Sequence, residues 1–320
     1  MPPTLVWRTD VHLSDRTPRS RKDDWTETVL EKLRQVGQIA REVDACAVLD
    51  GGDFFDVKSP QRNSHALVRA TAEVHKAYPC PVYANVGNHD CVYGDIEFLP
   101  QQPLGVLFAT GIFHRLYNEH EAVFEQDGVK VRVIGIPYHG TKYDLSRFAN
   151  LKKGDEDHLV VIGHQLASPA GGAMFEGEDI IKYADLMGLP ASTFAFGHWH
   201  KDQGVTEIAP GQHIVNVGSL TRGSLHLDDL DRKPCCVVMK FTKQTVEYEV
   251  RPLQIQAPEV IFDLETRNRV TTRAAQMSTF VASLQATLQH TSTTPLQDIV
   301  RGMELETQVK ERVLLLMEQS

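Results

Sequence analysis

Hydrophobic residues in the first half of the chain follow two alternating patterns. Short apolar runs at residues 4–9, 45–50 and 82–86 predict strands. Between them, over residues 25–43 and 67–77, apolar residues recur at steps of three and four, as the buried face of a helix requires. The resulting order of strand, helix, strand, helix and strand favours a layered sheet with helices on its outer faces.

The second half of the chain is richer in apolar runs that predict strands. These predicted strands lie at residues 120–126, 129–136, 158–163, 192–197, 204–208, 212–217 and 235–250. This number of strands favours two packed sheets rather than one. Segments 99–105 and 168–177 contain Pro and Gly and predict loops.

The pattern changes beyond Pro258, where no strand is predicted. Apolar residues recur at alternating steps of four and three over residues 270–288, which predicts an amphipathic helix. We therefore expect two parts, a catalytic domain over residues 1–258 and a helical extension over residues 259–320. The extension either packs on the sheets or, as a helical hairpin over residues 270–317, docks a partner or a second subunit.

Composition and charge narrow the class of protein. The chain has 320 residues, 42% of them hydrophobic, which is typical of a soluble globular protein. The sequence contains no apolar run of about 18 residues, the length that a membrane span needs. The first residues also lack the layout of a signal peptide, so we expect a cytoplasmic protein. A net charge of −9 argues against binding a polyanion through overall positive charge. The five cysteines form no CxxC pair, which favours buried free thiols.

Five short clusters of residue types that bind metals each directly follow a strand-like run. They are Asp10-Val11-His12, Gly52-Asp53 with Asp56, Gly87-Asn88-His89-Asp90, Gly163-His164 and Gly197-His198-Trp199-His200. Side chains at the ends of adjacent strands meet at one edge of a sheet. Imidazole nitrogens together with carboxylate and amide oxygens suit divalent ions such as manganese, iron or zinc. Each cluster alone has a structural explanation, such as a turn or a cap, but the five in this order predict a metal centre.

The five clusters resemble the signature of the calcineurin-like metallophosphoesterases, D-x-H, G-D, G-N-H-D/E, H and G-H-x-H. The resemblance covers about residues 4–218. It implies a four-layer α-β-β-α sandwich, in which two mixed β-sheets are flanked by helices, and a site for two metal ions. The implied ligands of the first ion are Asp10, His12, Asp53 and His200. The implied ligands of the second ion are Asp53, as a bridge between the ions, Asn88, His164 and His198.

Such a site has a clear chemical use. Two ions about 4 Å apart lower the pKa of a shared water and neutralise the oxygens of a phosphoryl group during in-line attack. We expect two Mn²⁺ ions, with Fe²⁺, Zn²⁺ or Mg²⁺ as alternatives. His89 stands between Asn88 and Asp90 in the sequence. Our hypothesis is that His89 contacts the phosphate and protonates the leaving oxygen, while the Asp90 carboxylate orients the His89 ring.

Finer features of the motifs favour one branch of this family. Phosphoprotein phosphatases carry an Arg in GDxxDRG, whereas this chain has GGDFFDVKS at residues 51–59. GGDFFD, the pair His164-Gln165, and GHWHKDQ followed by NVGSLTRGS instead resemble the SbcD-like nuclease subunits of double-strand-break repair. Ser14 stands where that branch usually has Gly after DxHL. The resemblance implies an exonuclease or endonuclease that acts on DNA.

Positively charged side chains near the predicted metal ions offer a way to hold a phosphodiester backbone. The loop over residues 16–22 carries four Lys or Arg side chains. Such a run is either a solvated face or a local clamp for phosphates. The candidate substrate-binding residues are Arg16, Arg19, Arg21, Tyr138, His139 and Arg222.

Three functions remain open at this stage. The first is a two-metal phosphodiesterase that hydrolyses DNA, and the second is a phosphodiesterase or phosphatase for small nucleotides or other phosphate esters. A scaffold that has lost catalysis ranks third, because all seven predicted metal ligands and His89 are present. The SbcD-like resemblance also implies a coiled-coil ATPase partner, docked through the C-terminal helices, or a homodimer.

Overall fold

The computed structural model of the chain describes four stretches and some single positions beyond them, which are residues 2–56, 63–170, 177–224 and 227–265 and positions 269, 272, 279, 300, 302 and 310. The chain divides into two compact units, Met1–Phe262 and Asp263–Ser320. The first unit ends at Phe262. The division into a catalytic domain and a helical extension at Pro258 stays a prediction. Most of the helical extension predicted over residues 259–320 lies outside the described residues.

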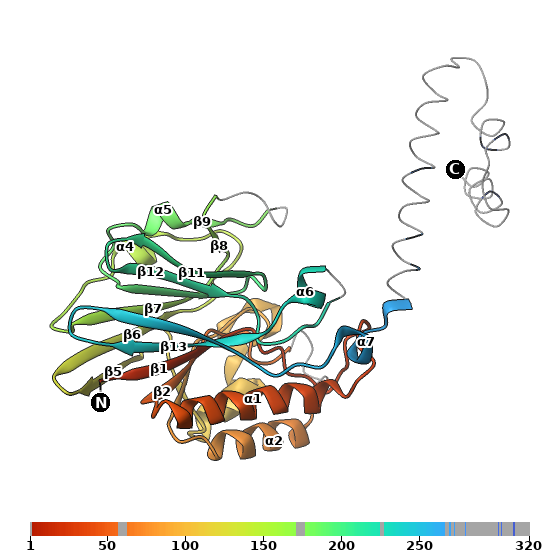
Figure 1. The fold of residues 1–320 in the computed structure, drawn as a ribbon, viewed down its shortest axis with the longest axis horizontal. Coiled ribbons are helices and arrows are strands. Elements are labelled where there is room, and N and C mark those ends of the chain that lie inside the picture. The colour runs from red at the N-terminus through yellow and green to blue at the C-terminus, as the bar shows by residue number, and fades with distance from the viewer. Residues whose placement is uncertain are drawn as a thin grey trace. The chain divides into compact units, whose positions relative to one another are not determined.

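Two six-stranded mixed sheets make up most of the first unit (Figure 1). The strands of the first sheet, in spatial order, are β14 (Val246–Pro252), β13 (Cys235–Phe241), β1 (Thr4–Arg8), β2 (Ala47–Asp50), β3 (Val82–Ala84) and β4 (Phe113–Arg115). Those of the second sheet are β11 (Asp202–Ala209), β12 (Gln212–Val217), β10 (Thr193–Gly197), β7 (His158–His164), β6 (Val129–Ile136) and β5 (Glu121–Gln126). Strands β1 to β4 are parallel, as are β6, β7, β10 and β12. A small parallel sheet pairs β8 (Ala167–Ser168) with β9 (Ile181–Lys182).

The described helices are mostly short, apart from two that follow β1 and β2. They are α1 (Trp25–Glu42), α2 (His65–Lys76), η2 (Val92–Gly94), η3 (Ile96–Gln101), α3 (Pro103–Ala109), α4 (Ser146–Ala149), α5 (Tyr183–Leu186), α6 (Leu227–Asp231) and α7 (Pro258–Ile261). The two long helices begin at side-chain caps, because Asp24 accepts a hydrogen bond from Glu27 N and Ser64 accepts one from Leu67 N. No described helix is both long and apolar enough to span a bilayer.

Three buried clusters define the layers of the first unit. Val6 of β1 and Val48 of β2 face helices α1, α2 and α3. Leu5 and Trp7, on the opposite face of β1, pack between the two sheets. Phe194 and its neighbours on the outer face of the second sheet pack against α4 and α5. The predicted fold, two mixed β-sheets flanked by helices, is therefore confirmed.

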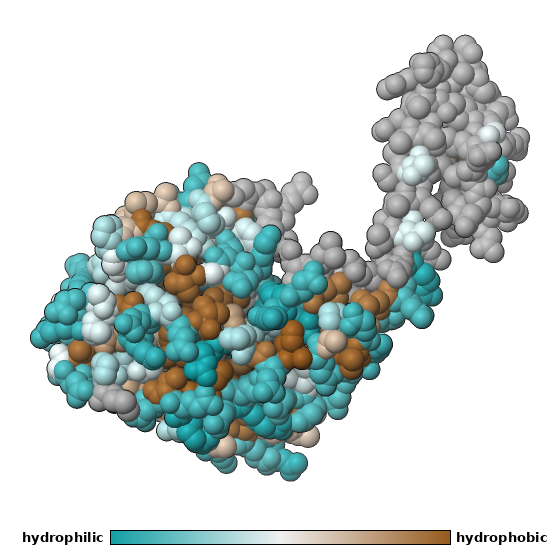
Figure 2. Space-filling model, viewed as in Figure 1, coloured by the Kyte–Doolittle hydropathy of each residue, from teal (hydrophilic) through white to brown (hydrophobic). Residues whose placement is uncertain are grey.

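The surface of the first unit is largely polar. On the face shown in Figure 2, hydrophilic residues cover most of the area and apolar residues form smaller patches between them. Among the described residues, the most exposed large apolar side chain is that of Tyr93, at 92%. Scattered exposure of this kind is normal for globular proteins.

The structure differs from the sequence predictions at several places. The single strand predicted over residues 235–250 is two strands, β13 and β14. Ser168, in the loop predicted over residues 168–177, belongs to β8, and residues 171–176 of that loop lie outside the described residues. Residues 99–105 form parts of η3 and α3 rather than a loop, because Pro103 occupies the first turn of a helix, where proline needs no N–H partner. Strand β4 has only three residues and was not predicted. All five cysteines are free as predicted, but Cys46 and Cys80 are only half-buried.

A buried ion pair lies between the first sheet and its helices. Arg8 Nε donates to Asp50 Oδ2 at 2.8 Å, and both side chains are fully buried. The same guanidinium group donates to the Tyr78 hydroxyl at 2.8 Å and to His75 Nε2 at 2.9 Å. The other Asp50 oxygen accepts from Gly52 N at 3.1 Å, at the start of the turn that leads to Asp53. This network ties β1, β2 and α2 together beneath the ends of the strands.

Replacing Asp50 with Ala should lower the free energy of unfolding by about 3–5 kcal/mol, because the Arg8 charge would be buried without a partner. Asp155→Ala is the matched control, since Asp155 pairs with Lys130 but its side chain is 83% exposed. That change should leave the free energy of unfolding almost unchanged, because water screens an ion pair at the surface. Urea unfolding followed by tryptophan fluorescence measures both effects, and equal losses in the two variants would contradict the prediction.

Candidate metal centre

The predicted metal ligands follow the carboxyl ends of neighbouring parallel strands. In the first sheet, Asp10, Asp53 and Asn88 come shortly after β1, β2 and β3. In the second sheet, His164 is the last residue of β7 and His198 directly follows β10. Strands β7 and β10 are neighbours, with Gly197 opposite His164 in the register. The ends of both sheets therefore supply side chains to one site.

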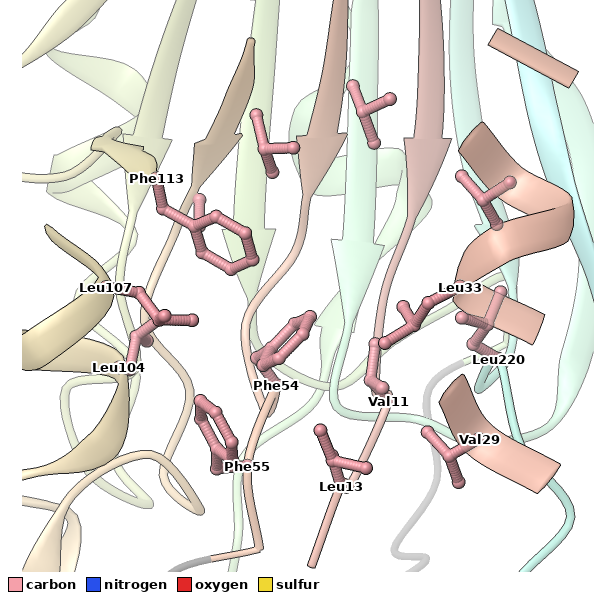
Figure 3. Close-up of a cluster of buried hydrophobic side chains, with 14 of the residues drawn as sticks. Val11, Leu13, Val29, Leu33, Phe54, Phe55, Leu104, Leu107, Phe113 and Leu220 are labelled. Carbon is pink, nitrogen blue, oxygen red and sulfur yellow. The ribbon is translucent and has the colours of Figure 1, made fainter. Parts of the chain in front are cut away.

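Apolar residues that alternate with the ligands anchor the loops of the first two clusters. Val11 and Leu13 after β1, and Phe54 and Phe55 after β2, point into the same buried cluster (Figure 3). An isolated β-bridge between Leu13 and Phe55 also joins the two loops, and Leu13 N donates to Phe54 O at 2.9 Å. Burial of these apolar side chains therefore fixes the loops that carry the predicted ligands.

The backbone at four of the predicted ligands is in the left-handed region that non-glycine residues seldom adopt. The φ angles are 53° at Asp10, 50° at His12, 53° at Asp53 and 83° at His198. Hydrogen bonds hold this conformation: Asp10 N donates to Gly52 O at 3.1 Å, and His198 N donates to Asp10 Oδ1 at 3.0 Å. Strain of this kind is typical of functional sites that the surrounding fold over-determines.

One group of ligand atoms matches the residues predicted for the first ion. Atoms of Asp10, His12, Asp53 and His200 all lie within 4.8 Å of one another. His12 Nε2 is 3.9 Å from Asp10 Oδ1 and 3.8 Å from Asp53 Oδ2. His200 Nε2 is 3.5 Å from Asp10 Oδ1. Two carboxylates and two imidazoles thus converge on one point.

A second group contains Asp53, His164 and His198, whose ligand atoms also lie within 4.8 Å of one another. Asp53 belongs to both groups, which is the arrangement that a carboxylate bridging two ions requires. Three buried atoms of predicted ligands, Asp53 Oδ2, Asn88 Oδ1 and His164 Nε2, have no hydrogen-bond partner among the described residues. Because a buried polar atom without a partner is costly, these donors fit a bound cation. The residues present therefore suit the predicted pair of divalent ions.

The charges of the site depend on one another. Burial alone would raise the pKa of Asp53, but His164, with Nε2 at 3.2 Å from Oδ2, holds that pKa well below its usual value. In the same way, burial would lower the pKa of His164, but the Asp53 carboxylate raises it to about 10. Burial, followed by His200 and His89, lowers the pKa of His12 to about 3. A divalent cation would take over the role of the His164 proton, so metal binding should displace it.

A glycine makes room for the bridging carboxylate. A β-carbon at Gly87 would lie 2.1 Å from Asp53 Oδ1 and 2.5 Å from Asp53 N, closer than atoms can approach. The space is needed because His89 N donates to the same Asp53 Oδ1 at 2.7 Å. The glycine of the third cluster therefore lets two of the loops meet.

The orienting partner of His89 is Asp56 rather than Asp90. His89 Nδ1 is 3.0 Å from Asp56 Oδ1, and its ring lies edge-on to that of His12, with centroids 4.8 Å apart. Asp90 is fully buried and its carboxylate accepts three main-chain hydrogen bonds, from Asp53 N, Phe55 N and Gly87 N at 2.8, 3.0 and 2.9 Å. The expectation that Asp90 orients His89 is therefore not met, because its oxygens hold the loops together instead.

Two of the candidate substrate-binding arginines have structural contacts. The Arg21 guanidinium group donates to Arg222 O and pairs with Asp23, and the Arg222 group donates to Leu230 O and Gln256 O. Both side chains are buried, and both guanidinium groups pack on the Phe262 ring. These contacts argue against a role in a substrate clamp for either residue. Arg16 and Arg19 are exposed.

The candidates after β6 differ from each other. The Tyr138 ring lies against the ligands, with its centroid 5.4 Å from that of His198. The His139 ring is used within its own loop, because Nδ1 is 3.0 Å from Pro137 O and Nε2 accepts from Asp144 N at 3.2 Å. The Tyr138 ring therefore lies beside the predicted ligands, whereas His139 organises the loop.

Sequence reasoning missed Glu178. Its Oε1 lies 2.9 Å from His198 Nε2 and accepts a hydrogen bond from the Tyr143 hydroxyl at 2.7 Å. Burial would raise the pKa of Glu178, but the bonds from His198 and Tyr143 lower it. The residue follows no strand and belongs to no motif, so only the tertiary structure shows its place beside a predicted ligand.

One sequence relative and several solved structures resemble this chain. One relative, the DNA double-strand break repair protein Mre11 of Archaeoglobus fulgidus, is 26% identical over an alignment of 269 residues, which covers 76% of this chain and 59% of that protein. The chain thus spans less than two thirds of that relative's length. Solved structures that resemble it include a dimetal phosphatase from Danio rerio, with a TM-score of 0.49 at 12% identity over 79% of this chain and 97% of that one. Another is TT1561 of Thermus thermophilus, with a TM-score of 0.48 at 13% identity over 78% and 99% of the two chains.

The comparison with protein families covers the region that carries the site. The sequence model of the calcineurin-like phosphoesterases matches residues 6–202, which is more than half of the chain. This region includes all five clusters and both groups of converging ligand atoms. The chain belongs to the calcineurin-like phosphoesterase family, whose members are hydrolases that depend on two metal ions.

Proposed function

We propose that this protein is a two-metal phosphodiesterase that hydrolyses DNA. The observation that carries the two-metal site is the convergence of two groups of ligand atoms that share Asp53. The DNA substrate is supported by the similarity to a protein named for DNA double-strand break repair. The motif GGDFFD and the pair His164-Gln165 add to this support, because they resemble the SbcD-like branch of the family.

Seven residues would hold the two ions. The first ion would be held by Asp10, His12, Asp53 and His200, and the second by Asp53, Asn88, His164 and His198. When bound, the ions supply a water of lowered pKa and positive charge for the phosphoryl oxygens. The mixture of imidazole nitrogens with carboxylate and amide oxygens suits Mn²⁺, and it also accepts Fe²⁺, Zn²⁺ or Mg²⁺.

His89 is the proposed proton donor to the leaving oxygen. Its Nδ1 is engaged by the Asp56 carboxylate, which leaves Nε2 for the substrate. The His89 ring stands edge-on to that of His12, which belongs to the first ligand group, so His89 lies beside the proposed first ion. Asp56 fixes the ring, and Asp90 fixes the loops that carry Asp53 and His89.

Two exposed arginines make up the proposed clamp for the DNA backbone. Arg16 and Arg19 lie in the loop that follows Leu13, directly after the first cluster. Their charges, with those of two metal ions, would offset locally the net charge of −9. Contacts to phosphates carry no sequence information, so we expect cleavage without strong sequence preference.

Residues 263–320 are the proposed site of a protein partner, a coiled-coil ATPase or a second copy of this chain. The amphipathic pattern over residues 270–288 supports this, because its narrow apolar stripe suits one partner helix. All the residues proposed to hold the ions and His89 precede this segment in the sequence, so the proposed chemistry does not depend on it.

The DNA substrate can be tested by hydrolysis assays with Mn²⁺ on end-labelled single-stranded DNA, end-labelled double-stranded DNA and bis-p-nitrophenyl phosphate. The wild type should cleave all three. Asp53→Asn should lose at least about 100-fold in rate on each, because it removes the charge shared by both ligand groups. Asp155→Asn, a surface change of the same type, should have no effect. Cleavage of the small diester alone would contradict the DNA proposal and point to a nucleotide or another phosphate ester as the substrate.

The role of His89 can be separated from metal binding. His89→Asn should lower kcat by about 10²- to 10⁴-fold, because a positioned proton donor contributes that much. Metal content, measured by plasma mass spectrometry, should stay at two ions. Asp56→Asn should lower kcat to a lesser extent, whereas Asp90→Asn should chiefly lower the melting temperature. Loss of metal from His89→Asn would show that this residue is a ligand instead.

The C-terminal unit can be tested by truncation after Phe262. This position is preferable to Pro258, because the Phe262 ring is buried against Arg21 and Arg222. The shortened chain should still hydrolyse bis-p-nitrophenyl phosphate, but it should sediment as a monomer under conditions in which the full chain self-associates. An unchanged association state would argue against residues 263–320 as the dimer surface.

A further inference from the structure

The carboxylate of Glu178 makes a contact that the proposed mechanism leaves unused. It accepts hydrogen bonds from His198 Nε2 at 2.9 Å and from the Tyr143 hydroxyl at 2.7 Å, both at Oε1. The side chains of Glu178 and His198 are each only 12% exposed. A charge-assisted hydrogen bond that is shielded from water in this way holds its partner more firmly than one on the surface.

The fold holds Glu178 in place from two sides. On one side, Ile181 N donates to Leu166 O at 2.9 Å, where β9 pairs with β8. On the other side, the neighbouring Asp179 carboxylate accepts from Tyr143 N at 3.0 Å. The Tyr143 hydroxyl that donates to Glu178 itself accepts from Leu166 N at 3.0 Å. The small sheet and the Tyr143 loop thus place a carboxylate beside His198 that the five clusters do not provide.

This contact determines which nitrogen of His198 is free. A carboxylate only accepts hydrogen bonds, so Nε2 carries the proton and Nδ1 carries the lone pair. His198 belongs to the second ligand group, with Asp53 and His164. A carboxylate that binds the remote N–H of a metal-binding histidine fixes the tautomer and the ring orientation and makes the free nitrogen a stronger donor.

We propose that Glu178 is a positioning residue for the second metal ion. It fixes the His198 ring so that Nδ1 is available to that ion, and Tyr143 in turn fixes Glu178. The inference rests on the proposed two-metal function and adds a residue from outside its motifs. It also predicts an asymmetry, because the contact reaches only the second ligand group and should leave the affinity of the first ion unchanged.

Neutralising one carboxylate beside His198 and one on the surface tests this assignment in the full chain. Glu178→Gln removes the charge beside His198, and the matched control Glu73→Gln removes a charge that pairs with Arg69 on α2, where the Glu73 side chain is 67% exposed. Mn²⁺ binding is measured by isothermal titration calorimetry and by electron paramagnetic resonance. Glu178→Gln should bind one ion as the wild type does and the other about 10- to 100-fold more weakly. At limiting Mn²⁺ its spectrum should be that of a single ion rather than a coupled pair, and Glu73→Gln should match the wild type.

Several results would overturn the proposal. Wild-type affinity for both ions in Glu178→Gln would show that the contact does not matter. Tighter binding would show that Glu178 competes with the metal for His198. Weaker binding of both ions with a lower melting temperature would show a role in folding alone. A wild type that binds fewer than two ions would contradict this inference and the two-metal function together, whereas a wild type that binds two ions but cleaves no DNA would contradict only the proposed substrate.

Discussion

Two buried carboxylates dictate how this site is built. Asp10 and Asp53 are almost completely inaccessible to water, and a buried negative charge without compensation costs several kcal/mol. The fold compensates part of this charge with main-chain N–H groups, such as that of His89 on Asp53 and that of His198 on Asp10, and with the imidazole of His164. Asp53 Oδ2 still accepts no hydrogen bond from the described residues and neither does Asn88 Oδ1, so these oxygens leave a demand for positive charge that a pair of divalent ions would meet. The predicted metal centre therefore follows from where the first sheet places these two acids.

The positions of these carboxylates depend on apolar side chains that are next to them in the sequence and packed in the core. Val11, Leu13, Phe54 and Phe55 alternate with or adjoin the ligands and lie in the helix-side core, so each loop is held by burial of its own neighbours. This anchoring allows the backbone at Asp10, His12 and Asp53 to stay in a strained conformation. The same rigidity suits a catalytic site, whose groups must be held within a fraction of an ångström before the substrate arrives.

Several charged side chains of this protein hold other residues in place. Asp90 binds three main-chain N–H groups, Asp56 engages His89 and Glu178 engages His198, so three acids outside the predicted ligand set hold the residues that would do the chemistry. The arginines behave in the same way. Arg8 and Arg222 are buried with hydrogen bonds on their guanidinium groups, so neither adds to the positive surface that a DNA strand would meet.

The sequence alone determined the fold, the family and most of the side chains that converge at the site. These depend on local patterns, because apolar runs that end in Gly with His, Asp or Asn place such side chains at strand ends. Tertiary structure decided the supporting contacts. Asp56 rather than Asp90 meets His89, and Glu178 reaches His198 from a segment with no motif, since both pairings depend on how distant loops pack. Composition could not show that Arg21 and Arg222 are buried on Phe262, because a charged residue looks the same in sequence whether it faces water or stacks on a ring.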